Sequence, residues 1–134
     1  MELKAERLSL VTQNDIILAR KKVREWSSEV GFTVVDQTKI VTAASELARN
    51  TVSYGGGGEM VISVVTNDQF KTGIQLVFED HGPGIADIQL ALTDGYTTGG
   101  GMGLGLPGSK RLMHEFNLET ELGKGTRITI TKWK

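Results

Sequence analysis

Hydrophobic residues recur along the chain at two spacings, one typical of strands and the other of helices. Apolar and polar residues alternate over residues 8–12, which predicts a short first strand. A helix is predicted next, because Asn14 or Asp15 can cap an apolar pattern of helical period that runs to about residue 30. Gly31 then ends this helix.

A second helix is predicted from Asp36, a capping residue, to the run of glycines at residues 55–58. This run predicts a loose helix end, because each glycine loses much conformational entropy when it becomes ordered. Two strands follow at residues 60–66 and 73–79, where β-branched and large apolar side chains are frequent. The polar residues 67–72 between them predict an antiparallel hairpin.

The last part of the chain predicts a short helix at residues 85–92, a longer helix at residues 104–116 and a final strand at residues 126–132. The order β-α-α-β-β-(α)-α-β predicts an α+β fold. We expect a two-layer α/β sandwich with a mixed, mostly antiparallel sheet and helices on one face. A doubly wound sheet would need strictly alternating helices and strands. The length of 134 residues suits a single domain, residues 1–134.

The composition is that of a soluble globular protein, with 39% hydrophobic and 23% charged residues. A net charge of -1 gives no electrostatic reason to expect nucleic acid or an anionic membrane as partner. The absence of cysteine excludes disulfides and cysteine-ligated metals. The N-terminus is charged, and no apolar run approaches the roughly 18 residues of a membrane span. We therefore expect a cytoplasmic protein.

Glu46 and Asn50 lie four residues apart and therefore share one face of the second predicted helix. An asparagine offers a neutral oxygen ligand to Mg²⁺. A glutamate can orient or deprotonate an attacking hydroxyl. An exposed polar helix face would give the same pair, so the spacing alone leaves both interpretations open.

Asp80 ends an apolar strand and is followed by the turn-forming residues His81, Gly82, Pro83 and Gly84. An aspartate at this point can accept a hydrogen bond from an exocyclic amine such as that of adenine. The glycines let a flat base approach the backbone closely. A tight turn built from glycine and proline is the alternative interpretation, and His81 is interpreted as a turn residue.

The glycine-rich segment at residues 99–105 reads GGGMGLG and leads into a predicted helix. Glycines at this point direct backbone N–H groups and the positive end of the helix dipole towards an anion such as a triphosphate. The segment is not a P-loop, because no Gly-Lys-Ser/Thr follows it. The sequence GKGT at residues 123–126 predicts, by itself, only a hairpin turn.

In combination, ELARN, DHGPGI, GGGMGLGLPG and GKGT resemble the N, G1 and G2 boxes and the terminal motif of the GHKL (Bergerat-fold) ATPase/kinase superfamily. The resemblance covers about residues 14–133. A finer resemblance rests on VDQTKIVTAASELARN, EDHGPGIADI, GLPGSKRLMHEF and TKWK. These stretches are similar to the RsbT-type switch serine/threonine kinases of the bacterial stressosome.

The resemblance implies a role for each matching residue. Asn50 would coordinate the Mg²⁺ that bridges the phosphates of ATP, and Glu46 would be the base for the attacking serine hydroxyl. Asp80 would bind the adenine amine, and Thr126 would support this contact, often through water. The remaining implied nucleotide-binding positions are Gly82, Gly84, Ile85, Gly99, Gly100, Gly101, Met102, Gly103, Leu104, Gly105 and Lys110.

The same resemblance implies ATP and Mg²⁺ as cofactors, a STAS-domain scaffold protein as substrate, and a PP2C-type phosphatase that the released kinase activates. The main alternative is an anti-sigma factor kinase, which holds a sigma factor. Such kinases carry E-A-x-x-N-A followed by a histidine, whereas this chain reads ELARNTVSYG. A non-catalytic, ATP-gated binding module is the third interpretation, and the presence of both Glu46 and Asn50 disfavours it.

Overall fold

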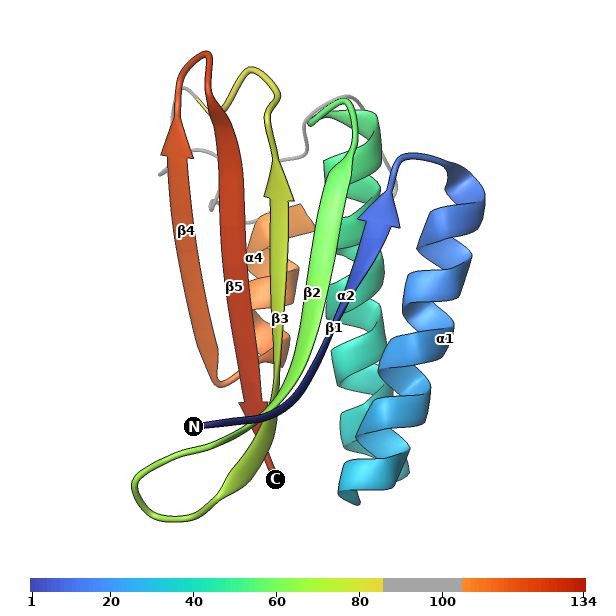
Figure 1. Ribbon diagram of the computed structural model, residues 1–134, viewed down its shortest axis with the longest axis vertical. Coiled ribbons are helices and arrows are strands. Elements are labelled where there is room, and N and C mark those ends of the chain that lie inside the picture. The colour runs from blue at the N-terminus through green and yellow to red at the C-terminus, as the bar shows by residue number, and fades with distance from the viewer. Residues whose placement is uncertain (86–104) are drawn as a thin grey trace.

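The computed structural model describes residues 1–85 and 105–134, which form one layer of helices on one layer of strands (Figure 1). In chain order the elements are β1 (Glu2–Leu10), α1 (Gln13–Val30), α2 (Val34–Ser53), β2 (Gly58–Thr66), β3 (Thr72–Asp80), α4 (Gly105–Leu112), β4 (Glu115–Glu121) and β5 (Gly125–Trp133). Among these elements, no helix has the length and hydropathy needed to cross a bilayer.

The five strands form one sheet in the order β1-β2-β3-β5-β4. Every strand pairing among the described residues is antiparallel, so the predicted α+β sandwich is confirmed and its sheet is more regular than expected. Figure 1 shows α1, α2 and α4 on one face of the sheet. The buried core lies between these helices and the inward side chains of the strands.

Both long helices begin earlier than the sequence analysis predicts. The N-cap of α1 is Thr12, whose hydroxyl accepts a hydrogen bond from the amide of Asp15. The Asp15 carboxylate in turn accepts from the amides of Val11 and Thr12, which lowers the pKa of Asp15. Similarly, Thr33 rather than Asp36 caps α2. In both cases the predicted aspartate occupies the third helical position, where a carboxylate complements the helix dipole.

The predicted helix at residues 104–116 is wrong in its last four residues. Helix α4 ends at Leu112, and β4 begins at Glu115. Strand β4 forms because its side chains alternate between exposed and half-buried, with Phe116, Leu118 and Thr120 on the inner side. Phe116 does pack against the core as expected, but from a strand.

Candidate functional site

One row of residues crosses the end of the sheet next to the helices. Asp80 pairs with Gly58 of β2 on one side and with Thr126 of β5 on the other, and Thr126 pairs with Thr120 of β4. The neighbouring row on the same face belongs to the core and consists of Met60, Phe78, Ile128 and Leu118. Since residues two apart point to the same face of a strand, the side chains of the first row continue the inner face beyond the core.

The Asp80 carboxylate is held at this edge by the turn that follows it. The amide of Gly82 donates to Asp80 Oδ1 at 2.9 Å. The adjacent carboxylate, Glu79, points to the opposite face, where it accepts from Arg127 at 2.7 Å. This hydrogen bond and the negative charge of Glu79 raise the pKa of Arg127. Asp80 is therefore the carboxylate that the end of β3 presents on the helix side.

The glycine run after α2 packs closely against this carboxylate, which corrects the prediction of a loose helix end. A Cβ on Gly55 would lie 2.5 Å from Asp80 Oδ2, and a Cβ on Gly82 would lie 2.7 Å from the Gly55 carbonyl oxygen. The amide of Gly55 donates to the carbonyl of Asn50, and that of Gly57 to the carbonyl of Thr51. At Gly55 and Gly82 the entropy lost is the cost of a close backbone approach that no side chain would permit.

The turn after Asp80 is fixed to the hairpin between β4 and β5. The amide of Gly123 donates to the Pro83 carbonyl, and a Cβ on Gly84 would lie 2.5 Å from the Glu121 carbonyl oxygen. Gly84 also has a φ of +78°, a conformation that favours glycine. The GKGT turn, expected at the start of the last strand, thus also supports the DHGPGI turn.

Thr120 organises this region, and the sequence analysis missed it because it predicted no element between residue 116 and the turn at residues 123–125. Its hydroxyl donates to the Gly125 carbonyl at 3.1 Å and accepts from the amide of Ile85 at 2.9 Å. It also lies 3.0 Å from the hydroxyl of Thr126. A threonine hydroxyl has one proton, so Thr126 must be the donor in this pair. The remaining lone pairs of Thr126 can therefore accept a hydrogen bond beside Asp80.

Glu46 lies on the inner face of α2 and is only 8% exposed. Arg49 donates to one of its carboxylate oxygens at 2.8 Å, and the backbone amide of Gly105 donates to the other at 3.2 Å. Gly105 is the first residue of α4, so this contact joins α2 to the end of the glycine-rich segment. A carboxylate oxygen has two lone pairs, so both oxygens can still accept a further hydrogen bond.

Asn50 is half-buried one turn further along α2, close to the Asp80 edge through the hydrogen bond between its carbonyl and the Gly55 amide. Among the described residues there is no group of three His, Cys, Asp or Glu side chains that could hold a metal. A site with one protein oxygen ligand suits Mg²⁺, which keeps several waters and uses substrate phosphates as ligands. The donor set therefore fits magnesium bound together with a phosphate compound.

The structure brings together Glu46, Asn50 and Gly105 at the end of α2, and it aligns Asp80 with Thr126 at the edge of the sheet. Gly82, Gly84 and Ile85 lie in the turn that connects to both. Lys110 is exposed in the last turn of α4, at the opposite end of that helix from Gly105. The predicted positions Gly99, Gly100, Gly101, Met102, Gly103 and Leu104, and all but the first residue of the predicted helix at residues 85–92, lie outside the described residues.

This edge combines the carboxylate of Asp80, closely packed glycine backbone, the half-buried Asn50 and the nearly buried carboxylate of Glu46. The family of histidine kinase-, DNA gyrase B- and HSP90-like ATPases matches residues 35–134, and the chain belongs to this family. The predicted GHKL membership is thereby confirmed, and the family implies the use of ATP.

Two kinds of relative are similar to the chain over most of its length. It is 48% identical over 124 residues to the serine/threonine-protein kinase RsbT of Bacillus subtilis, with 92% of each chain covered. It is 32% identical over 118 residues to an anti-sigma F factor of Clostridium novyi, with 85% of this chain and 82% of the relative covered. The prediction of a serine/threonine-protein kinase is confirmed by the first of these relatives.

Solved structures share the fold at much lower identity. The RsbU and RsbW domains of a Mycobacterium tuberculosis protein match with a TM-score of 0.63 and 21% identity, over 97% of this chain and 32% of that longer chain. The SiaB-SiaC complex of Pseudomonas aeruginosa matches with a TM-score of 0.56 and 12% identity, over 99% of this chain and 91% of the matched chain.

Proposed function

We propose that this protein uses Mg-ATP to phosphorylate a serine or threonine of a STAS-domain regulatory protein in the cytoplasm. Once released, it activates a PP2C-type phosphatase in a stress-response pathway that controls a sigma factor. The observation that carries the catalytic part of the proposal is the contact of the nearly buried Glu46 with the first amide of α4. The 48% identity to a serine/threonine kinase of Bacillus subtilis supports the choice of substrate hydroxyl.

The adenine-binding part of the site consists of Asp80 and the residues around it. Asp80 accepts a hydrogen bond from the adenine amine, because its carboxylate can only accept. Thr126 also acts as an acceptor, directly or through a water, since its own proton goes to Thr120. Gly82 and Gly84 pack directly against the backbone of Gly55 and Glu121, where a side chain would collide, and so fix the turn that positions Asp80.

The phosphate part of the site involves the end of α2 and the segment before α4. Asn50 supplies the protein ligand to Mg²⁺, and the glycine-rich segment ahead of Gly105, whose own amide donates to Glu46, offers backbone amides to the phosphates. Lys110 lies in the last turn of α4, away from Gly105, so no phosphate contact is assigned to it. Bound Mg-ATP supplies the phosphoryl group and neutralises part of its charge. The protein contributes positioning and electrostatic stabilisation, which is most of what phosphoryl transfer needs.

Glu46 receives the proton of the attacking hydroxyl or orients that hydroxyl. Its two oxygens are held by Arg49 and by the Gly105 amide, so the carboxylate has a fixed direction. A fixed base loses little entropy when the substrate arrives. Water must be kept away for transfer to a protein hydroxyl to outcompete hydrolysis.

The anti-sigma relatives support a second candidate, a kinase that also holds a sigma factor. Identity to an anti-sigma F factor reaches 32%, well below the 48% found for the switch kinase. The two candidates share the nucleotide site and differ in the partner. A binding module without catalysis remains the third candidate, and it gives no role to the two contacts that hold Glu46.

The test is a transfer experiment with γ-labelled ATP, Mg²⁺ and purified STAS-domain proteins and sigma factors from the same organism. The proposal expects label on a serine or threonine of a STAS-domain protein, and capture of a PP2C-type phosphatase by the released kinase. Capture of a sigma factor instead would support the anti-sigma candidate. Tight ATP binding without label on any partner would leave the binding module.

Two variants connect this experiment to the site. Asn50→Ala is expected to abolish Mg-ATP binding, whereas Glu46→Gln is expected to bind ATP and lose transfer. Ser45→Ala is the matched control on the same helix, because the Ser45 hydroxyl donates to the backbone carbonyl of Val41. Normal transfer by Glu46→Gln would show that the assigned base is wrong.

A further inference from the structure

The guanidinium of Arg49 lies against the nearly buried carboxylate of Glu46. Its Nη1 donates to Glu46 Oε1 at 2.8 Å, and the two residues form an ion pair within α2. The side chain of Arg49 is 48% exposed, whereas that of Glu46 is 10% exposed. Arg49 therefore covers the carboxylate from the solvent side, where a substrate must approach it.

Most donors of this guanidinium are available for a further ligand. An arginine side chain has five N–H groups. Within the described part of the chain, the Arg49 side chain makes one hydrogen bond, the one to Glu46. The planar fork of an arginine suits two oxygens of a phosphate group at once. Arg49 can therefore bind an anion without releasing Glu46.

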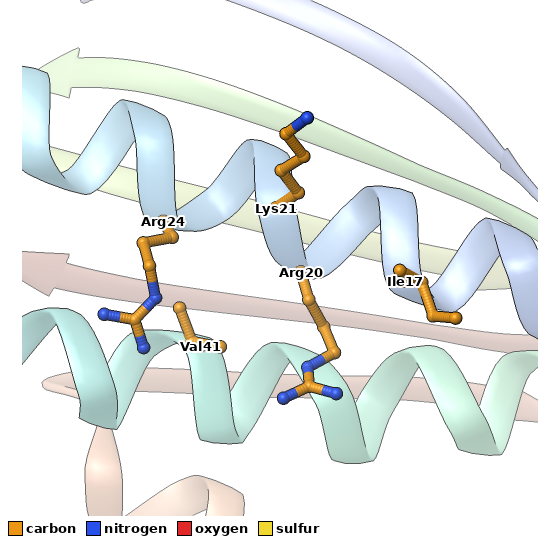
Figure 2. Close-up of a pocket in the computed structure, with 5 residues that line it drawn as sticks. All are labelled: Ile17, Arg20, Lys21, Arg24 and Val41. Atoms are coloured by element: carbon orange, nitrogen blue, oxygen red, sulfur yellow. The ribbon is translucent and has the colours of Figure 1, made fainter.

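The arginines of α1 are placed differently. Figure 2 shows Arg20 and Arg24 extending from α1 over α2, on either side of Val41. Neither of them forms an ion pair with a described residue. The two basic residues in the last turn of α4 lie at the opposite end of that helix from its contact with Glu46. Arg49 is the cation that forms an ion pair with the proposed base.

Glu46 lies between Arg49 and Asn50 around the axis of α2, because residues three and four positions apart are neighbours on a helix surface. The proposed magnesium ligand, the base and the guanidinium are thus adjacent. A base in action lies within about 3 Å of the attacking oxygen, and that oxygen is roughly 3–3.5 Å from the phosphorus. A group in contact with the base is therefore next to the phosphoryl group.

We propose that Arg49 binds the phosphoryl group during its transfer while Nη1 keeps its contact with Glu46. The inference rests on the proposed function and adds a catalytic residue to it. In the transfer step, the substrate oxygen forms a bond to phosphorus as the bond from phosphorus to the ADP oxygen breaks. The hydroxyl proton passes to Glu46.

The proton that Glu46 receives changes the charge balance around Arg49. As the carboxylate becomes neutral, it no longer balances the guanidinium, and the positive charge of Arg49 then stabilises the oxygens around phosphorus. This stabilisation is gained in the transition state and not with bound ATP. Arg49 therefore accelerates transfer without tightening the binding of ATP.

The test compares the binding of Mg-ADP with that of Mg-ADP and aluminium fluoride, which mimics the phosphoryl group during transfer. A water molecule takes the place of the substrate hydroxyl, so the calorimetric titration needs no partner protein. The wild type is expected to bind the fluoride complex at least about 100-fold more tightly than Mg-ADP. Arg49→Gln is expected to weaken the fluoride complex roughly 10- to 150-fold. Its Kd for Mg-ADP is expected to change by less than about twofold.

Three further variants serve as controls. Lys39→Gln removes an exposed positive charge near the other end of α2 and is expected to change either Kd by less than about twofold. Glu46→Gln keeps a side-chain oxygen that can accept from Arg49, so it is expected to retain the tight fluoride complex and to lose transfer. Arg49→Lys keeps the charge without the fork, and an intermediate Kd for the fluoride complex is expected.

The result that overturns the inference is an unchanged Kd for the fluoride complex in Arg49→Gln, because Arg49 would then act only by holding Glu46. Equal weakening of Mg-ADP and of the fluoride complex would show a structural role and overturn it as well. A wild type that gains nothing from aluminium fluoride has no such site, and one that binds no magnesium nucleotide refutes the proposed function too. Selective weakening in Arg49→Gln supports the inference even if no STAS-domain protein is phosphorylated, in which case only the proposed partner is wrong.

Discussion

Replacing Gly55 by alanine is expected to change the proposed nucleotide site without replacing any residue assigned to ATP binding. The added Cβ would lie 2.5 Å from Asp80 Oδ2 and 2.6 Å from Asp80 Cβ. Carbon atoms in contact are normally about 3.5–4.0 Å apart, so the two residues must separate by roughly 1 Å. Rotation of the carboxylate alone cannot provide this, because the contact with Asp80 Cβ remains. The backbone at the end of β3 must therefore move as well.

The size of the effect follows from the hydrogen bond that Asp80 provides in the proposed site. A hydrogen bond to a charged group contributes about 1.5–3 kcal/mol. Its loss corresponds to a rise in the Kd for ATP of roughly 10- to 150-fold. Forcing a methyl group into a close contact also destabilises the fold by about 1–3 kcal/mol.

The assay is a calorimetric titration of Gly55→Ala with a non-hydrolysable ATP analogue and Mg²⁺, together with chemical denaturation. Gly56→Ala is the matched control. Gly56 has a φ of +74°, so alanine there strains the backbone, but a Cβ meets nothing within 4 Å. It is expected to lose stability and keep its ATP affinity. If Gly55→Ala binds ATP within about twofold of the wild type, the contact with Asp80 does not hold the adenine site.

Three further predictions concern other contacts. Thr120→Val should lower the free energy of unfolding by about 1–3 kcal/mol, because the half-buried amide of Ile85 loses its acceptor. ATP affinity should fall as well. A variant as stable as the wild type in urea would refute this. Arg49→Gln should keep ATP affinity but slow phosphoryl transfer roughly 10- to 100-fold, because Glu46 is no longer held in a fixed position. The control Arg7→Gln breaks the exposed ion pair with Glu59 and should leave the rate of transfer unchanged. Asp15 has a pKa lowered from 3.8, so its contribution to stability is present above that pH and is lost as the pH falls through the folded-state value. Asp15→Asn should therefore be less stable than the wild type at pH 7, and the difference should shrink as the pH falls below 3.8. A constant difference in denaturation would contradict the assignment.

The sequence predicted the regular parts of this fold because their patterns are long and local. The second helix carries a continuous apolar face, and its polar pair at Glu46 and Asn50 follows from a spacing of four residues. The hairpin of β2 and β3 has two β-rich segments around a polar loop. Such elements bury their own patterned face, so a short window of sequence determines them.

The parts that were missed depend on contacts between distant residues. Strand β4 alternates correctly, but Leu112, Met113 and Phe116 also fit a helical period, and only pairing with β5 decides between the two. Gly55 could not be interpreted from the sequence, because its neighbour Asp80 is 25 residues away along the chain. The roles of the candidate site residues remain predictions.

The hydrogen bonds of Thr120 have a consequence for how this family can vary. The Thr120 hydroxyl donates its single proton to the Gly125 carbonyl and accepts from the Ile85 amide. In the contact between the two threonines, the proton must therefore come from Thr126. A substitution at position 120 that removes the hydroxyl would free the proton of Thr126, which could then donate to a bound base instead of only accepting from it. Substitutions at these two positions are therefore expected to occur together in evolution, and a chain that keeps only one of the two threonines should differ in its choice of nucleotide base.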